Sequence, residues 1–406
     1  MSNTRKPKNS RRRSGSRRDE QIRGRRVSQD ELHEQFAVMR AVDAAEALGD
    51  AEAAAAIIDS MPDGPDGKPF WRPWRLRRLA QLIELQDVLP RWAVSRWILG
   101  QALQQLDDAS RDRGKRALQI AVDVRGGEER LPGVDHIDAQ CKVIDHDWVY
   151  RQQYLYDLGG LRHFLRTAAS VDLVTGADRI ADWASVAMGG YRLQAVASGA
   201  LVWEDLSSGR TRQVLDLGSA ALVAVGDCVI GRVVPIDGGE MFESSPLSVA
   251  EEVARRVSEN PRTWVDVLTP WVREYTEREG EAHARALLAG AHDFGLLTDV
   301  PEVLWRTLFE APDGPTARLS QNPTAVIADA VGFFELVATT ADPDYPEMNR
   351  VWPWVAAVLV VPRVVPVLAH RLGPGHAQAL HRVADRLTEP AATLCRGLAE
   401  ACREAS

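Results

Sequence analysis

The chain has 406 residues, of which 45% are hydrophobic and 26% charged, and its formal net charge is −8. A chain of this length is too long for one simple hydrophobic core, so we expect two or three domains. The composition is ordinary for a soluble globular protein. The negative charge argues against a large phosphate-binding face on the folded body.

The N-terminal segment, residues 1–27, is basic and lacks apolar periodicity. Residues 1–26 contain eleven Lys and Arg and two acids, a net charge of +9, so residues 27–406 carry −17. A segment this rich in Arg, Ser and Gly cannot bury enough apolar surface to offset the entropy of ordering, and we predict a disordered arm. Its cations can neutralise phosphates without reading a base sequence. The residues predicted to contact nucleic acid are Arg11, Arg12, Arg13, Arg17, Arg18, Arg25 and Arg26.

Residues 28–187 are predicted to form a helical domain. Ser28 and Glu31 make a capping box ahead of an apolar-periodic stretch, and Gly49 ends that helix before a second one begins. Pro73 and Pro90 suit the first turns of two further helices.

The stretch "FWRPWRLRR" at residues 70–78 interleaves aromatic residues with arginines. Such rings can stack on bases while guanidinium groups contact phosphates. The alternative, which we favour, is that one side of a helix faces the core while the arginines extend along the surface or pair with acids. The core residues would be Trp74 and Leu79, and the arginines Arg75, Arg77 and Arg78.

The stretch "GVDHIDAQCKVIDHDWVY" at residues 133–150 concentrates histidines, aspartates and a cysteine. On one helix over 134–158, His136 and His146 would point about 80° apart and lie about 15 Å apart along the axis. One metal ion cannot use both unless the helix breaks. We therefore predict a structural helix with a solvated flank and an apolar stripe. The stripe consists of Ile137, Cys141, Ile144, Trp148 and Leu155.

Residues 188–250 have a different pattern, with short Val- and Leu-rich runs punctuated by "SSGR", "VGD" and "DGGE". This predicts four or five antiparallel strands in a small barrel or curled sheet, with a hairpin at "WEDLSSGRTRQVLDL". Cys228 and Arg232 would share one strand face. Arg232 could bind an anion or a peptide carboxylate, but pairing with a neighbouring acid is the favoured interpretation.

Residues 251–406 are predicted to be helical. Their most apolar run, at 351–370, contains Arg363 and three prolines, and its uninterrupted part is shorter than the ~18 residues of a membrane span. We interpret it as a buried core helix. No apolar segment follows the basic N-terminus, so no signal peptide is expected. Four cysteines without a CxxC pair indicate reduced thiols in a cytoplasmic protein.

Known catalytic motifs give little support for an enzyme. The chain contains no phosphate loop, no GxSxG elbow and no HExxH helix. Two His-Asp dipeptides, at 146–147 and 292–293, would fit one class of metal phosphohydrolase. Its residues would be His136, His146, Asp147, His292 and Asp293.

Three stretches resemble a group of uncharacterised proteins from actinobacteria: "YRQQYLYDLGGLRHFL", "ADRIADWASVAMGGYRL" and "VGDCVIGRVVPIDGGEMFESSPL". The resemblance covers roughly residues 145–265. It implies a helical body around a small β module and supplies neither an activity nor catalytic residues.

Together these observations predict an α+β, mostly α-helical fold in which helical domains flank a small antiparallel β module. The predicted units are the arm (1–27), an N-terminal helical domain (28–187), the β module (188–250) and a C-terminal helical domain (251–406).

The expected function is that of a non-enzymatic, cytoplasmic binding or regulatory protein. The arm would contact nucleic acid non-specifically and the helical body a protein partner. We assign no cofactor, no metal ion, no catalytic residue and no membrane contact. One alternative is a protein-interaction scaffold with an incidental tail, and another is a metal-dependent hydrolase that uses the His-Asp pairs.

Overall fold

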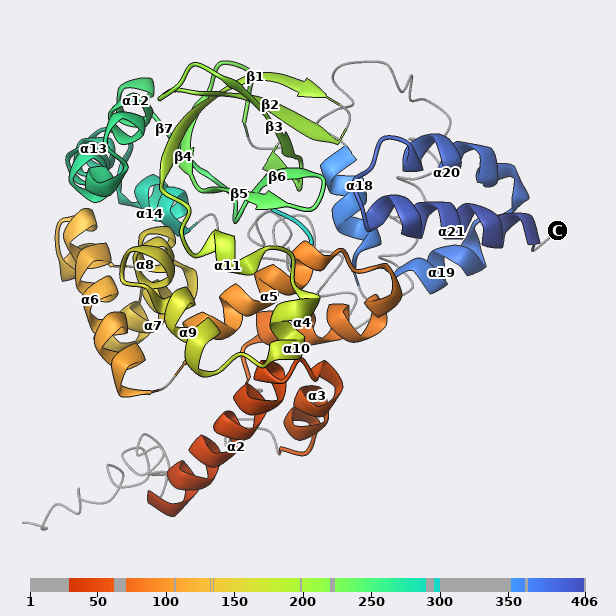
Figure 1. Ribbon diagram of the computed structural model, residues 1–406, viewed down its shortest axis with the longest axis horizontal. Coiled ribbons are helices and arrows are strands. Elements are labelled where there is room, and N and C mark those ends of the chain that lie inside the picture. Colours follow the sequence, from red (N-terminus) through yellow and green to blue (C-terminus); the bar gives the residue numbers. More distant parts are fainter. Residues whose placement is uncertain are drawn as a thin grey trace, which may run out of the picture.

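The structure is a computed structural model, and it describes ten stretches of the chain: 29–61, 71–105, 107–131, 133, 135–197, 199–219, 223–289, 296–299, 352–361 and 364–404. The predicted arm lies outside these residues. Within them the fold is α+β and mostly helical, with a single seven-stranded curled sheet, which confirms the predicted fold class (Figure 1).

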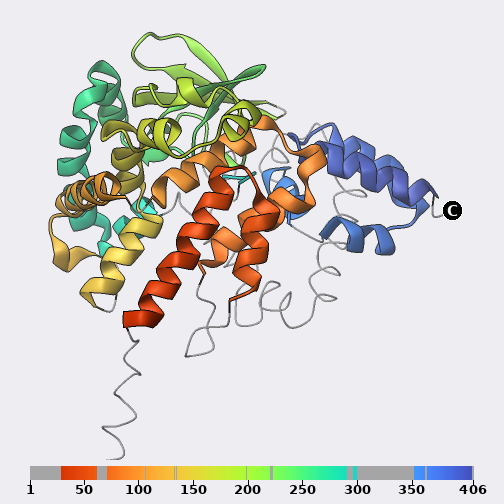
Figure 2. The same ribbon diagram turned by 60° about the horizontal axis from the view of Figure 1, so that its bottom comes forward.

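Local sequence signals fix the first helices. α2 ends where Gly49 takes a left-handed conformation (φ 85°), and Asp50 then caps α3 by accepting a hydrogen bond from the Ala53 amide at 2.8 Å. Pro73 opens α4 as predicted, and Pro90 immediately precedes α5. α2 and α3 form an adjacent helical pair (Figure 2).

Helices form the whole N-terminal part of the described chain. In chain order they are α2 (Gln29–Ala47), α3 (Ala51–Asp59), α4 (Pro73–Glu84), α5 (Arg91–Leu103), α6 (Asp108–Arg125), α7 (His136–His146), α8 (Trp148–Gln152), the π-helical turn η3 (Gln153–Asp157), α9 (Gly160–Thr167), α10 (Val171–Gly176) and α11 (Ile180–Trp183).

The sheet has seven strands in the order β5-β6-β3-β2-β1-β4-β7. All neighbouring strands are antiparallel except β3 and β6, so the sheet is larger than the predicted four or five strands and contains one parallel pair. The predicted hairpin is present as β2 and β3. The strands are β1 (Gly189–Ala197), β2 (Ala200–Asp205), β3 (Thr211–Leu215), β4 (Cys228–Gly231), β5 (Val233–Ile236), β6 (Gly239–Phe242) and β7 (Leu247–Val249).

The sheet curls closed because β4 and β5 are two parts of one bent chain segment, separated only by Arg232. β4 pairs with β1 and β7, whereas β5 pairs with β6 at the other end of the strand order. The ring of Phe242 packs edge-on against Tyr191 and Trp203 inside this curl, at 5.5 Å in each case. The outer side of β4 and β5 packs on helices, so both faces of these strands are buried.

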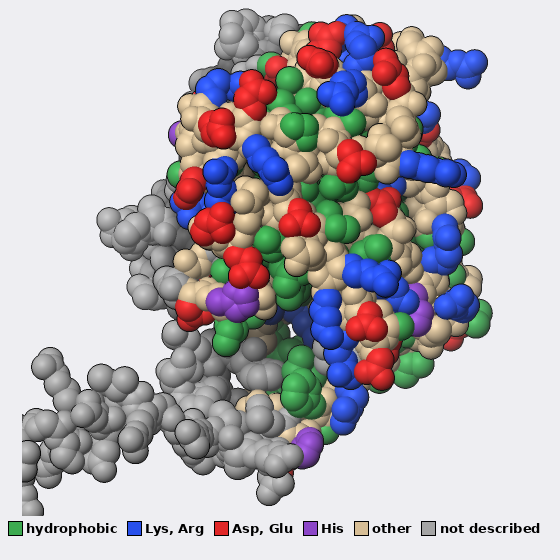
Figure 3. Space-filling model, turned by 90° about the vertical axis from the view of Figure 1, so that its left-hand side faces the viewer, with side chains coloured by type: hydrophobic (Ala, Val, Ile, Leu, Met, Phe, Trp, Pro, Cys, Tyr) green, Lys and Arg blue, Asp and Glu red, His purple; other side chains and the backbone are tan. Residues whose placement is uncertain are grey.

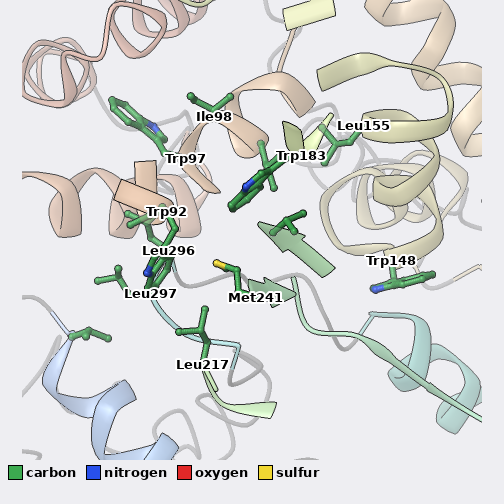
Figure 4. Packing of buried hydrophobic residues seen from close by; sticks show 14 of the residues in the cluster. Trp92, Trp97, Ile98, Trp148, Leu155, Trp183, Leu217, Met241, Leu296 and Leu297 are labelled. Atoms are coloured by element: carbon green, nitrogen blue, oxygen red, sulfur yellow. The ribbon is translucent and has the colours of Figure 1, made fainter. Parts of the chain in front are cut away.

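The C-terminal helices lie on two sides of the sheet. α12 (Glu251–Glu259), α13 (Trp264–Glu279) and α14 (Glu281–Ala289) lie on the side of α6 and α8, and α18 (Trp352–Leu359), α19 (Val364–Arg371), α20 (Ala377–Ala384) and α21 (Ala391–Glu404) lie on the other (Figure 1). One buried cluster joins these helices, the outer face of the sheet and the N-terminal helices. Trp92, Met241 and Leu217 meet Leu296 and Leu297 in its centre (Figure 4).

The apolar run at 351–370 forms two helices rather than the single core helix that was predicted. Within the described residues, no single helix is long and apolar enough to span a membrane; α18 and α19 pass that test only as a pair bent by 95°. Trp352, Val355 and Leu359 of α18 are buried. The division into separate domains at residues 28, 188 and 251 stays a prediction, although helix gives way to strand and strand to helix near the last two positions.

Candidate functional site: a cleft lined by arginines and aromatic rings

A cavity of about 800 Å³ lies among α2, α4, α5, α6, α7 and α8. Its volume falls within the range of small-molecule sites, about 300–1,000 Å³. On the face of the molecule that carries α6 and α7, a hollow opens with Lys and Arg side chains along one edge (Figure 3). The residues that give the cleft its character are the aromatic Trp71, Trp74, Tyr150 and Tyr154, the basic Arg72, Arg75, Arg78, Arg111, Lys115 and Arg151, and the acidic Asp43, Asp145 and Asp147.

The stretch 70–78 forms one wall of the cleft. The Arg75 guanidinium lies 5.1 Å from the ring centre of Trp71, and the Arg78 guanidinium lies 4.7 Å from that of Trp74. Each arginine thus covers a tryptophan face, an arrangement stabilised by the ring quadrupole. Leu79 is buried in the core, and Arg75 pairs with acids, as predicted. Trp74, which was predicted to face the core, instead is half-buried and lines the cavity together with Arg75 and Arg78.

Two carboxylates of α2 share the cation of Arg75, and one of them, Asp43, lines the cleft. Arg75 donates to Asp43 at 2.6 Å and also pairs with Glu46, while the indole N–H of Trp97 donates to Glu46 at 3.2 Å. Burial raises the pKa of both Asp43 and Glu46 and outweighs the opposing effect of the Arg75 charge. Arg75 is therefore already neutralised from within the protein.

The stretch 133–150 forms the opposite wall, but not as one helix. α7 ends at His146, and Asp147 is extended (φ −85°, ψ 126°) and caps α8 by accepting from the Tyr150 amide at 2.6 Å. Asp147 is also ion-paired with Arg125. The prediction of a single helix over 134–158 is therefore wrong, because the side chain of Asp147 offers the backbone a better start for a new helix.

This break also overturns part of the predicted apolar stripe. Trp148 and Leu155 are buried as predicted, but Ile137 and Ile144 are 72% and 42% exposed. The residues that α7 buries are Ala139 and Val143. The predicted stripe continued one helical periodicity through the break, although the two helices have different orientations. It therefore assigns Ile137 and Ile144 to the buried face, although they lie on the exposed one.

The histidines and aspartates of this stretch do not converge. In the described part of the chain, no group of three or more His, Cys, Asp and Glu side chains could hold a metal ion. His136 lies 2.8 Å from the Gln140 amide nitrogen, whereas Asp147 is bound to Arg125. His292 and Asp293 of the second dipeptide lie outside the described residues.

The mouth of the cleft is basic. Arg72 donates to Asp145 at 2.7 Å and so links α4 to α7. Arg111 and Lys115 lie one turn apart on α6, with side chains 64% and 78% exposed. Because i and i+4 side chains share a helix face, these two cations act on the same region of the mouth.

Aromatic side chains form the floor. The rings of Tyr150 and Tyr154 stack with centres 5.9 Å apart, and burial raises the pKa of both, so their hydroxyl groups stay protonated at neutral pH. Gly114 of α6 faces this floor, because a Cβ there would lie 3.4 Å from the Tyr150 oxygen. The absence of a side chain at Gly114 leaves part of the cleft open.

Arg232, the other arginine singled out by the sequence, lies in a separate buried network. It donates to Gln152 at 2.9 Å, to the Val186 carbonyl at 2.6 Å and to Asp157 at 2.7 Å. The favoured prediction of pairing with an acid is confirmed. These bonds use one donor on each of its three nitrogens, which makes Arg232 a link between the sheet and the helices.

The seven arginines predicted to contact nucleic acid lie outside the described residues, so the structure assigns them no position. Sequence reasoning missed the α2 acids and the α6 cations of the cleft. The sequence signal that could have indicated the cleft is the spacing of Arg111 and Lys115, which are four residues apart with Gly114 between them. That pattern is common on exposed helices and points to no site without its partners.

Comparison of the chain with protein-family models, with curated proteins and with solved structures gave no match in any of the three. The resemblance to actinobacterial proteins therefore stays an expectation. The function has to be inferred from the chemistry of the arm and of the cleft.

Proposed function

We propose that the protein is a non-enzymatic, cytoplasmic binding protein that associates with nucleic acid. The observation that carries the proposal is the gathering of six basic side chains and four aromatic rings around one cleft that also contains three aspartates. Arg111 and Lys115 lie exposed at its mouth, in a body whose sequence is otherwise acidic. Rings and cations are the two side-chain types that contact single-stranded nucleic acid without sequence preference. The four unpaired cysteines support a reducing compartment.

The arm supplies the non-specific part of this binding. Its net charge of +9 over residues 1–26 attracts the phosphate backbone and releases condensed counterions when it binds. Because it precedes α2, which contributes Asp43 and Met39 to the cleft wall, the arm and the cleft belong to the same end of the chain. The arm is proposed to hold the strand, and the cleft to add contacts that depend on the bases.

Binding of labelled duplex and labelled single strand across a salt series tests the proposal. The full-length protein is expected to bind with a steep salt dependence, about 0.9 in log–log slope for each duplex phosphate neutralised. A protein that starts at Ser28 is expected to lose most of this slope. A matched control replaces Arg11, Arg12, Arg13, Arg17, Arg18, Arg25 and Arg26 by Lys, which keeps the charge and should keep the binding. Equal binding by the full-length and shortened proteins would contradict the role of the arm.

A protein partner for the helical body is a second proposal, favoured by the surface of α7. Ile137 and Ile144 are both exposed and lie seven residues apart on one helix, so they share a face that adjoins the cleft, which Ile144 lines and Ile137 does not. If this face binds a protein, Ile137→Asp should abolish capture of that partner while leaving the salt-dependent nucleic-acid binding unchanged. If removal of residues 1–27 abolishes capture of the partner while Ile137→Asp does not, the partner binds the arm, and the assignment of the α7 face is wrong.

A further inference from the structure

We propose that the cleft accepts one nucleoside phosphate, with the base inside and the phosphate at the mouth. The unit is either a free mononucleotide or one nucleotide of a bound single strand; the second form rests on the proposed function, and the first does not.

The mouth offers cations that a phosphate can recruit. Arg111 pairs with Asp108 at 3.1 Å and Lys115 with Asp112 at 3.8 Å, and all four side chains are largely exposed. Exposed ion pairs of this kind contribute about 0–1 kcal/mol, so a ligand carrying a full negative charge can displace them. Arg111 and Lys115, on one face of α6, can then both bind the same phosphate group.

The interior cations, in contrast, are already paired. Arg75 is held by Asp43 and Glu46, and Arg151 donates to the buried Glu243 at 3.1 Å. A phosphate seated inside would have to replace these carboxylates while keeping them buried, which costs several kcal/mol per unpaired charge. The charged end of the ligand therefore lies at the mouth and its neutral end inside.

The interior suits a flat ring that carries donors and acceptors on its edge. The indole N–H of Trp74 and the side-chain oxygen of Gln104 are buried in the cleft lining and have no hydrogen-bond partner among the described residues. One is a donor and the other an acceptor. A nucleobase offers a partner to both kinds of group once the side chains that cover them shift, whereas a hydrocarbon offers a partner to neither. The side chains of Tyr150 and Tyr154 also line the cleft.

The test is calorimetric titration of the full-length protein with the mononucleotides of adenine, guanine, cytosine and uracil. Adenosine and inorganic phosphate, titrated separately, report the base and phosphate halves, and a short single-stranded oligonucleotide reports the strand. At least one mononucleotide is expected to bind at least about tenfold more tightly than either half, since phosphate and ring contacts act together.

Two variants locate the binding. The double charge reversal Arg111→Glu with Lys115→Glu is expected to weaken mononucleotide binding at least about tenfold, because the phosphate loses both cations. Gly114→Leu removes no charge but fills the cleft beside Tyr150, and should weaken binding equally. Arg116→Glu is the control, since Arg116 is exposed on the same helix and does not line the cleft. Circular dichroism and thermal unfolding confirm that each variant folds.

The outcomes separate this inference from the proposed function. Mononucleotide binding that survives removal of residues 1–27 but fails in both cleft variants supports the inference, whether or not the oligonucleotide binds. If the mononucleotides bind while duplex and strand do not, the ligand is the free nucleotide, and the proposed nucleic-acid function fails alone. The inference is overturned if no mononucleotide or strand binds, or if folded Gly114→Leu and the charge-reversed protein bind as tightly as wild type.

Discussion

Arg232 donates from Nη2 to Oδ1 of Asp157 at 2.7 Å and thereby joins the bend between β4 and β5 to the π-helical turn η3. The other oxygen of Asp157 accepts from the indole N–H of Trp264 at 2.7 Å. Three parts of the chain that are distant in sequence therefore meet at one carboxylate. The guanidinium also lies 4.5 Å from the ring centre of Tyr156, so the ring covers the buried Arg232, whereas the side chain of Asp157 stays 34% exposed.

Replacement of Arg232 by Met is expected to lower the free energy of unfolding by about 3 kcal/mol, since Asp157, Gln152 and the Val186 carbonyl each lose a donor. Urea denaturation measures the change. Arg179→Met serves as the control, because its pair with Asp182 is exposed and should matter by less than about 1 kcal/mol. Equal losses in the two variants would show that this partly buried pair adds nothing beyond a surface pair.

A matched pair of glycine substitutions tests the contact between β1 and α12. A Cβ at Gly190 would overlap the carbonyl oxygen of Ala254, so Gly190→Ala must push backbone apart and should destabilise by at least about 2 kcal/mol. Gly397 lies in α21 with open space around it, and Gly397→Ala should instead stabilise by about 1 kcal/mol through helix propensity. The same denaturation assay applies, and a stable Gly190→Ala protein would argue against this close approach.

The carboxylates that share Arg75 predict a pH dependence of stability. The pKa values of Asp43 and Glu46 are raised on folding, so the folded state binds more protons than the unfolded chain above the ordinary values of about 4. The stabilisation that this proton binding gives the folded state is fully present below the ordinary pKa values. It is lost as the pH rises through the raised pKa values of the folded state. Wild type should therefore gain stability relative to Glu46→Gln when the pH falls from about 7 to about 5.

Urea unfolding at the two pH values measures this difference. The exposed carboxylate of Asp182, which pairs with Arg179 at the surface, provides a control, and Asp182→Asn should keep the wild-type response. If Glu46→Gln and wild type change in parallel, the shared cation holds both carboxylates charged, and the proposed cost of burial is absent.

Thiol accessibility should single out one cysteine. Cys228, Cys395 and Cys402 are buried, whereas Cys141 is partly exposed on α7. Burial raises the pKa of Cys228 and Cys402 and raises that of Cys395 to about 12, which removes reactive thiolate at neutral pH. A chromogenic disulfide reagent should therefore titrate one fast thiol in the native protein and four after unfolding. Cys141→Ser should abolish the fast phase and Cys402→Ser should keep it. Two fast thiols would contradict the burial of Cys228, Cys395 or Cys402.

Much of the secondary structure could be predicted from the sequence because its signals are local. Gly49 and Pro73 mark helix boundaries through their own backbone preferences, and "SSGR" marks the turn of the β2–β3 hairpin. The alternation of short Val-rich runs with turn residues was enough to predict a curled sheet. Such preferences act over a few residues and need no knowledge of the rest of the fold.

The same local reasoning failed at Asp147, where two continuations of the chain compete. Helical periodicity favours one long helix, and the capping capacity of the aspartate favours a break. The ion pair with Arg125 stabilises the second choice, but that arginine comes from α6. A pattern within the stretch contains no information about this partner.

The sequence by itself determined several helix boundaries and the β2–β3 hairpin, the α+β class and the charge contrast between arm and body. Only the tertiary structure decided that Arg72 meets Asp145, that Arg75 meets Asp43 and Glu46, and that one cleft joins these pairs to α6. The physical reason is that charged and aromatic side chains accept many partners of similar energy. Which partner each one meets depends on how the helices pack, and packing depends on the whole apolar core.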